Sequence, residues 1–112
     1  MAISQNLVID QGTTFTAEVS IFTDDKYRYD LLSYTAAAQM RKSPTSTTAT
    51  SFTCTVGTPP YQGVVTISLT ATQTLALTPG RYMYDVVITN TASGAKYRAV
   101  EGIITVTPAI TR

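Results

Sequence analysis

The side chains best suited to chemistry in this chain are its carboxylates and one thiol, because the 112 residues include no histidine. Without an imidazole, a serine or cysteine nucleophile lacks its usual base, and a metal site lacks its commonest nitrogen ligand. Three carboxylates, Asp24, Asp25 and Asp30, fall within one predicted loop region. A calcium site there would need a regular Asp or Asn spacing with a glycine and a distal glutamate, which the sequence lacks. A solvated turn is the competing interpretation.

The single cysteine, Cys54, excludes an internal disulfide. It alternates with Phe52 and Val56, so we expect it on the inner face of a strand as a small buried side chain. A reactive thiol is the alternative, but no histidine is present to activate it. Charged residues make up 13% of the chain and the net charge is +1, so no electrostatic footprint for nucleic acid or an anionic membrane exists. We therefore expect no enzymatic activity, no cofactor and no metal.

Tyrosine is the one residue type that could provide a binding surface. Four tyrosines lie beside predicted loops or charged residues, at Tyr27, Tyr29, Tyr61 and Tyr97. Tyrosine is favoured at protein interfaces, where the ring is buried and the hydroxyl keeps a partner. We predict these four rings as interface residues, and the alternative is that they are ordinary surface tyrosines of a small domain.

A strand from about residue 80 to residue 90 organises the rest of the chain. Pro79-Gly80 is a turn signal, and the residues after it alternate between an apolar face and a polar one. The apolar face carries Tyr82, Tyr84, Val86 and Ile88. Either tyrosine could be the corner tyrosine of a Greek-key sandwich, with its hydroxyl bonded to backbone between residues 75 and 79. The alternative is that both rings are simply core aromatics.

Most other segments also alternate with period two, which predicts strands at residues 6–10, 15–21, 26–32, 51–56, 64–69 and 96–106. Residues 34–41 have helical propensity, but eight residues are few for a helix and their apolar positions alternate, so we predict a strand. Residues 70–78 form a crossover that can hold one helical turn capped by Thr70 or Thr72, with Leu75 and Leu77 over one end of the core.

The last two strands should form a hairpin through residues 90–95, with Gly94 available for a positive φ. We place a β-bulge at Gly102, where the alternation changes phase. Arg81 and Asp85 are expected on the outer face, with Arg98 and Glu101 on the neighbouring strand. Such cross-strand ion pairs would set the register of the sheet and would not form a functional site.

Seven or eight alternating strands with hairpin or crossover links predict an all-β fold, an immunoglobulin-like antiparallel β-sandwich in one domain spanning residues 1–112. Residues 1–5 and 107–112 lack core patterning and are predicted to be short terminal arms that order on a neighbouring subunit, adding a strand to its sheet. The start of the chain has no signal-peptide pattern, and no apolar run approaches the roughly 20 residues that span a bilayer.

Four segments carry a resemblance to a family, namely IDQGTTF at 9–15, YDLLSY at 29–34 with AQMR at 38–41, GVVTISLT at 63–70 with residues 77–85, and VEGIITVTP at 100–108. Together they resemble the small immunoglobulin-like domains of tailed-phage virion proteins, and the chain looks like the free-standing versions of cyanophage-type virions. It is also similar to the amino-terminal domain of some upper baseplate proteins. The resemblance covers nearly the whole chain, although each motif alone recurs in unrelated sandwiches.

The resemblance implies a non-enzymatic virion subunit, made in the host cytoplasm, that docks on the particle surface. Capsid decoration is the leading expectation, and a neck, tail or baseplate position is the alternative. Its expected partners are other virion proteins and copies of itself in a symmetric assembly. A non-viral carbohydrate- or protein-binding sandwich remains the competing function, although tryptophan, the best material for a glycan platform, is absent.

Overall fold

The structure is a computed structural model that describes all residues except 1–2, 22–29, 44, 58–62 and 111–112. The described residues form nine strands and one short helix: β1 (Ile3–Ser4), β2 (Leu7–Asp10), β3 (Phe15–Ser20), β4 (Tyr34–Arg41), β5 (Thr50–Ser51), β6 (Thr53–Val56), β7 (Val64–Leu69), α1 (Ala71–Leu75), β8 (Gly80–Asn90) and β9 (Lys96–Thr107). No helix among them is long and apolar enough to cross a membrane.

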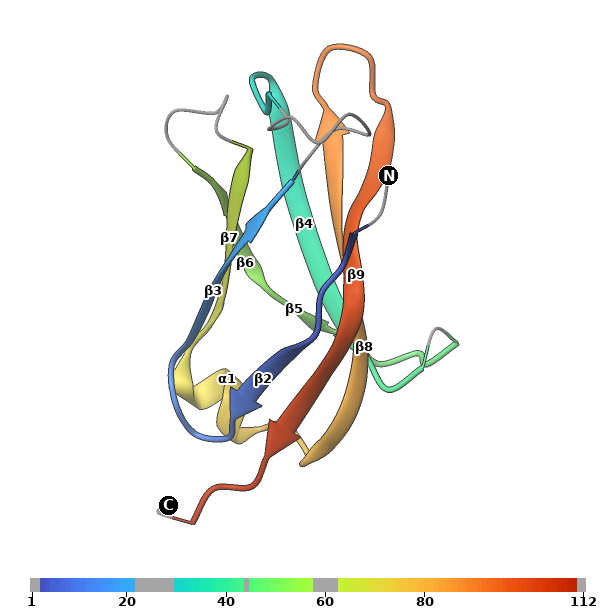
Figure 1. Cartoon of the computed structure of the whole chain (residues 1–112). Coiled ribbons are helices and arrows are strands. Elements are labelled where there is room, and N and C mark those ends of the chain that lie inside the picture. The colour runs from blue at the N-terminus through green and yellow to red at the C-terminus, as the bar shows by residue number, and fades with distance from the viewer. Residues whose placement is uncertain (1–2, 22–29, 44, 58–62, 111–112) are drawn as a thin grey trace.

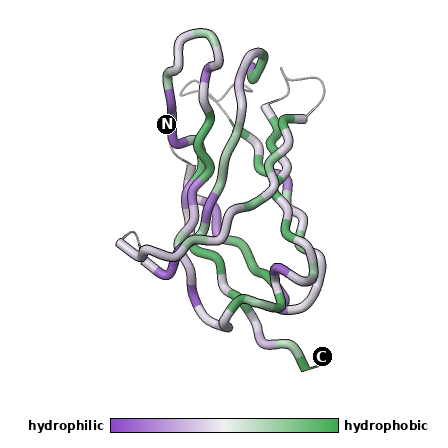
Figure 2. The backbone as a smooth tube through the Cα atoms, turned by 180° about the vertical axis from the view of Figure 1, so that it is seen from behind, coloured by the Kyte–Doolittle hydropathy of each residue, from purple (hydrophilic) through white to green (hydrophobic). Residues whose placement is uncertain are grey.

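The strands form two layers packed face to face (Figure 1). The larger sheet has the order β1-β9-β8-β4-β5, with β2 also paired to β9, and the smaller sheet has the order β3-β7-β6. Hydrophobic stretches lie along the strands of both layers when the molecule is seen from behind (Figure 2). This arrangement confirms the predicted immunoglobulin-like sandwich, with a strand count close to the expected one.

The core lies between the layers and is built from alternate residues of each strand. β8 contributes Tyr82, Tyr84, Val86 and Ile88, all buried as predicted. β7 contributes every second residue, with Val65, Ile67 and Leu69 at 2% exposure or less. Strand β4 has the bounds that the sequence predicted. Its side chains alternate as expected for a strand, since Ala38 and Met40 are buried while Gln39 between them is exposed. Tertiary burial thus outweighs the helical propensity of this segment.

The segment from Thr50 to Val56 changes sheets, which the single predicted strand at 51–56 missed. Ser51 pairs with Gln39 of β4 in the larger sheet, whereas Thr53 pairs with Ser68 of β7 in the smaller one. Phe52 lies at the crossing, buried against the ring of Phe15 with 6.0 Å between ring centroids. The anchoring of this ring lets the chain leave one layer and join the other without exposing apolar surface.

The amino-terminal strands run parallel to β9, whereas the sequence predicted only antiparallel pairing. Ile3 lies opposite Val100, and β2 continues the ladder from Leu7 opposite Ile104 to Asp10 opposite Thr107. The amide of Ala109 also donates to Oε1 of Gln11. Residues 3–5, Thr107 and Ala109 were predicted to belong to arms that order on a neighbouring subunit, and this is corrected because their backbone groups pair within the same molecule.

The crossover from β7 to β8 holds the predicted helical turn. Thr70 caps α1 with a reciprocal pair of bonds: its Oγ1 accepts from the amide of Gln73, and its own amide donates to Oε1 of Gln73. Leu77 is buried over the end of the core, but Leu75 is half exposed, which corrects the prediction that both cover it. The buried residue of α1 is Thr74, so the next residue, Leu75, faces outward.

The β-bulge lies at Ala99, not at Gly102 as predicted. Val86 pairs with Val100, and the next residue, Val87, pairs with Arg98, so Ala99 is the extra residue of β9. Gly102 has a different role, because a Cβ there would overlap the Gln5 carbonyl and lie 3.1 Å from the Tyr84 ring. Glycine at position 102 thus lets the segment between β1 and β2 cross close over β9.

Candidate protein-docking surface

The outer face of the larger sheet carries the most varied exposed chemistry among the described residues. Cross-strand pairing arranges it in rows, because paired residues of neighbouring strands point to the same side. One row joins Gln39, Asp85 and Glu101, and the next joins Arg41, Met83 and Ile103. A third row places Val8 of β2 beside Thr105 of β9 and Arg81 of β8.

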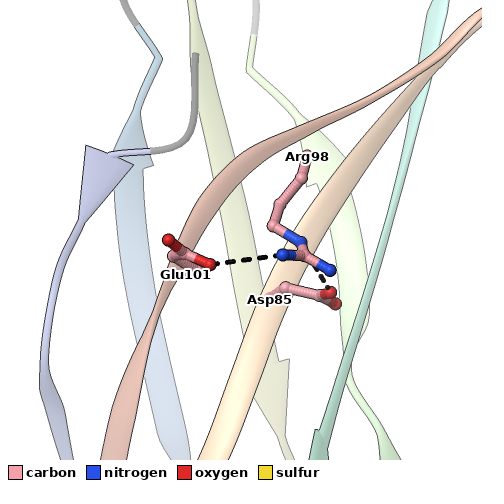
Figure 3. A network of polar contacts seen from close by, with 3 residues as sticks. All are labelled: Asp85, Arg98 and Glu101. Carbon is pink, nitrogen blue, oxygen red and sulfur yellow. Dashed lines mark hydrogen bonds and ion pairs between the residues drawn. The ribbon is translucent and has the colours of Figure 1, made fainter. Parts of the chain in front are cut away.

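The charged row contains a like-charge pair whose repulsion a third residue offsets in part. Asp85 and Glu101 are direct cross-strand partners, an arrangement that is destabilising by itself. The bulge at Ala99 turns Arg98 to this face, where Nε lies 3.3 Å from Oδ2 of Asp85 and Nη1 lies 3.4 Å from Oε2 of Glu101 (Figure 3). The predicted cross-strand ion pairing is confirmed for Arg98 and Asp85, whereas Arg98 and Glu101 pair along the same strand. Arg81, which was predicted alongside them, has no carboxylate partner among the described residues.

A shallow hollow of about 270 Å³ lies over this network. Gln39, Arg41, Met83 and Tyr84 complete its lining. Arg41 is held by donating to the Ser46 carbonyl at 2.6 Å and to Oε1 of Gln39 at 3.1 Å. Asp85 and Glu101 thus share one cation, Arg98, and the side chain of each acid is more than a third exposed. This arrangement suits a polar contact with another protein.

Beside the charged row lies a strip of exposed hydrophobic side chains that sequence reasoning missed. We call Val8, Met83 and Ile103 the apolar strip, and their exposed fractions are 61%, 47% and 38%. Met83 and Ile103 are cross-strand partners, and Val8 lies on the next strand one row along. The sequence contained one signal for this strip, namely large hydrophobic residues at outward positions of strands whose outer faces are otherwise polar.

The two tyrosines of β8 are structural. The hydroxyl of Tyr82 donates to the Thr78 carbonyl at 2.8 Å and accepts from the Thr78 amide at 3.1 Å, which is the corner interaction predicted for this part of the chain. The hydroxyl of Tyr84 donates instead to the Gln5 carbonyl at 2.6 Å, and burial raises the pKa of Tyr84 to about 12. Neither hydroxyl is available for chemistry on a ligand.

The predicted tyrosine patch falls mostly outside the described residues. Tyr27, Tyr29 and Tyr61 are in the parts of the chain that the structure does not describe. Tyr97 is 43% exposed, but it pairs with Ile88, whose side chain points into the sandwich. The bulge at Ala99 therefore places Tyr97 on the opposite side of the sheet from the apolar strip.

A second hollow, of about 480 Å³, lies between residues 42–50 and 76–78 at the end of the sandwich. It is lined by hydroxyl side chains together with Lys42 and Tyr82. The Lys42 ammonium covers the Tyr82 ring, with Nζ 4.4 Å from the centroid, and Tyr82 itself is buried. The aromatic face is thus occupied and cannot serve as a stacking platform for a sugar ring.

The remaining candidates for chemistry have structural surroundings. Cys54 is half-buried against the core, as its alternation predicted in part, and burial raises the pKa of its thiol above the usual value while a backbone hydrogen bond with Ala38 opposes that shift. Asp30 accepts from the amide of Leu32 at 3.0 Å in a local turn, whereas Asp24 and Asp25 lie outside the described residues. Within the described part of the chain, no three acidic, cysteine or histidine residues gather as metal ligands.

Neither a protein-family model nor a curated protein sequence matches the chain. Among solved structures, it is similar to InlP of Listeria monocytogenes with a TM-score of 0.51 at 16% identity, over 95% of this chain and 28% of that one. It is also similar to the natural killer cell receptor NKp44 with a TM-score of 0.49 at 15% identity, over 95% of this chain and 100% of that one. The chain thus spans less than a third of InlP. The similarity to InlP, together with the two packed sheets, shows an immunoglobulin-like β-sandwich fold and nothing beyond the fold.

Proposed function

We propose that the protein is a non-enzymatic structural subunit that docks on another protein through the outer face of its larger sheet. The observation that carries this proposal is the apolar strip of Val8, Met83 and Ile103, three large hydrophobic side chains exposed on adjacent strands. Scattered single hydrophobic residues are normal on a protein surface, but a contiguous group beside polar neighbours is typical of an interaction site. Methionine and arginine, which are both enriched at interfaces, lie side by side here as Met83 and Arg41.

The setting we propose is the surface of a tailed-phage virion, with capsid decoration ahead of a neck, tail or baseplate position. Support for this setting comes from the sequence segments that resemble small virion domains, at 9–15, 29–34 with 38–41, 63–70 with 77–85, and 100–108. The low charge of the chain fits repeated packing against a particle, since uncharged surfaces are cheaper to desolvate than ionised ones. A non-viral binding module is the competing function.

Mass spectrometry of virus particles purified from a lysate of cells that produce the chain tests the setting. We expect the chain in the particles, and a copy number comparable to that of the major capsid protein would support decoration. A small fixed number of copies would support the neck, tail or baseplate instead. Absence from purified particles would overturn the virion assignment, and strong signals on a glycan array would favour the carbohydrate-binding alternative.

The docking face has its own test. Replacing both Met83 and Ile103 with lysine should weaken co-sedimentation with the particles by about tenfold or more, since truncating a central interface anchor typically costs at least about 1 kcal/mol. The change should leave the fold intact because both side chains lie on the outer face of the sheet, where they are 47% and 38% exposed. Thr35→Lys is the matched control, since Thr35 is exposed on β4 in the same sheet, away from the strip. Equal binding of the double variant and the control would count against this face.

A further inference from the structure

Strand β3 forms one margin of the smaller sheet, and its outer backbone edge is unpaired among the described residues. The amide of Ile21 donates to the Gly63 carbonyl at 2.7 Å, so the odd-numbered residues of β3 direct their backbone groups toward β7. The N–H and C=O groups of Thr16, Glu18 and Ser20 therefore point away from the sheet. No described strand pairs with them, since β2, the strand before β3 in the chain, pairs with β9.

Apart from the charge of Glu18, this edge lacks the features with which proteins usually block strand addition. β3 keeps an unbroken register over six residues and contains no proline, lysine or bulge. The outermost strands of the other margins are short, because β1 and β5 have two residues each and β2 and β6 have four. Strand β5 pairs with only Gln39 and Met40 of β4, so residues 35–37 of β4 form a second, shorter stretch of edge with no described partner strand. The outward backbone groups of Thr16, Glu18 and Ser20, along a strand of six aligned residues, make β3 a good template for an added strand in the described part of the molecule.

The side of the sandwich next to this edge is also incompletely covered. Strand β6 packs against β4, so β3, at the opposite margin of its sheet, lies on the side of β1 and β2. Two hydrophobic residues on this side, Leu7 of β2 and Ala17 of β3, are only partly buried against the core. A strand added to β3 would bring inward side chains over these two residues, so apolar burial would add to the backbone hydrogen bonds.

The sequence of β3 fits a second copy of itself in one register. In an antiparallel pair around a two-fold axis, the outward-pointing backbone groups of the even-numbered residues must face each other. Placing the axis at Ala17 sets Thr16 opposite Glu18 of the other copy, and only small methyl groups meet at the axis. Placing it one residue along would set the two Glu18 carboxylates opposite each other, which is destabilising. Glu18 thus disfavours the register with the axis at residue 18 and is compatible with the register with the axis at Ala17.

We propose that two copies of this chain associate through antiparallel pairing of their β3 strands about Ala17, joining their smaller sheets into one continuous six-stranded sheet. This symmetric pairing is isologous, so it closes at two copies and leaves the apolar strip on each copy free. The proposal does not depend on the virion assignment, because it requires no other protein. For an interface of one strand pair, we expect a dissociation constant of roughly micromolar to millimolar strength.

Proline at position 18 tests the edge selectively. The Glu18 N–H points away from β7, so Glu18→Pro removes a donor of the proposed pairing without removing a hydrogen bond of the fold, and proline is tolerated at such positions. Glu18→Ala is the matched control, since it removes the same carboxylate and keeps the N–H. In sedimentation equilibrium, we expect dimers for the unchanged protein and for Glu18→Ala, and at least a tenfold weaker association for Glu18→Pro.

A second measurement covers the case in which Glu18→Pro fails to fold. In the unchanged protein, the amide signals of Thr16 and Glu18 should shift with increasing protein concentration and exchange more slowly with solvent. A monomer at every concentration up to about 1 mM, or a dimer in which these amides do not respond, would overturn the proposal. The proposal would also be overturned if Glu18→Pro still formed the dimer while the double variant with lysine at positions 83 and 103 did not. Such a result would place association on the apolar strip.

Discussion

Two tyrosines separated by one residue show how position decides the role of a side chain. Tyr82 and Tyr84 share one face of β8, and both rings are buried. The hydroxyl of Tyr82 closes a local turn at Thr78, whereas the hydroxyl of Tyr84 reaches the Gln5 carbonyl near the start of the chain. The first bond joins neighbours and the second joins residues 79 positions apart. Tyr84 therefore links the amino-terminal segment to the centre of the larger sheet.

The buried Tyr84 hydroxyl makes the stability of the protein sensitive to alkaline pH. Its pKa rises from an ordinary value of 10.0 to about 12 in the folded state because burial disfavours the phenolate. The unfolded chain thus releases this proton at lower pH than the folded one. The contribution is fully present below pH 10 and is lost as pH rises from about 10 to about 12.

We expect the free energy of unfolding, measured in urea from neutral pH to about pH 12, to fall less steeply for Tyr84→Phe than for the unchanged protein in the alkaline range. At neutral pH the same change should cost about 1 kcal/mol, because the Gln5 carbonyl loses its donor. Tyr97→Phe is the control, since Tyr97 is 43% exposed and its replacement should change little. Identical alkaline slopes for all three proteins would contradict this role of Tyr84.

At the scale of the elements, α1 is held to the sandwich by one buried hydroxyl. Thr74 is fully buried, and its Oγ1 accepts from the Gly12 amide at 3.1 Å and donates to the Thr13 carbonyl at 2.7 Å. These bonds join the β7–β8 crossover to the turn between β2 and β3. The side-chain amide of Gln11 adds a second link by donating to the Leu77 carbonyl at 2.8 Å.

Thr74→Val should destabilise the protein by about 1–3 kcal/mol, because valine has a similar shape but leaves the Gly12 amide and the Thr13 carbonyl without their partner. Thr74→Ser keeps the hydroxyl and should lose no more than about 1 kcal/mol for one methyl group. Chemical denaturation gives the two values, and amide exchange at Gly12 should accelerate in the valine variant alone. Slow exchange at Gly12 in Thr74→Val would show that the hydroxyl is not its main partner.

The sequence predicted those elements whose signals are local. The period-two pattern of residues 34–41 predicted β4 with its observed bounds, and the threonines of the crossover predicted a helical turn capped by Thr70 or Thr72, of which Thr70 is the cap. The bulge was misplaced because Ala99 and Val100 are both apolar, so hydropathy cannot show which of them is the extra residue. The parallel pairing of β1 and β2 depends on contacts almost a hundred residues apart, for which local pattern has no signal.

The candidate site was less predictable than the fold for the same reason. Arg98, Asp85 and Glu101 were recognisable as charged residues of neighbouring strands, but their meeting depends on the bulge. The apolar strip combines residues from three strands, and none of its members is unusual alone. Pairing registers, which the sequence does not encode locally, decide that Val8, Met83 and Ile103 are neighbours.

The whole molecule is a sandwich in which the first and last strands of the described chain lie together. β1 and β2 both pair with β9, so the larger sheet is completed only when the two ends of the chain have met. Opposite this pair, the β3 edge remains open in the smaller sheet. The amino-terminal strands thus cover the β9 margin of the larger sheet, whereas the β3 margin of the smaller sheet is the one that we propose pairs with a second copy.

The parallel ladder between β2 and β9 also determines how the domain resists mechanical load. A force applied between Ile3 and Thr107 pulls the two strands past each other along their length, so the bonds from Leu7–Ile104 to Asp10–Thr107 bear the tension together. A force between Asp10 and Thr107, which are direct partners, opens the same ladder one bond at a time. Single-molecule stretching should therefore record a higher rupture force for the first attachment than for the second, and equal forces would mean that another part of the sandwich yields first.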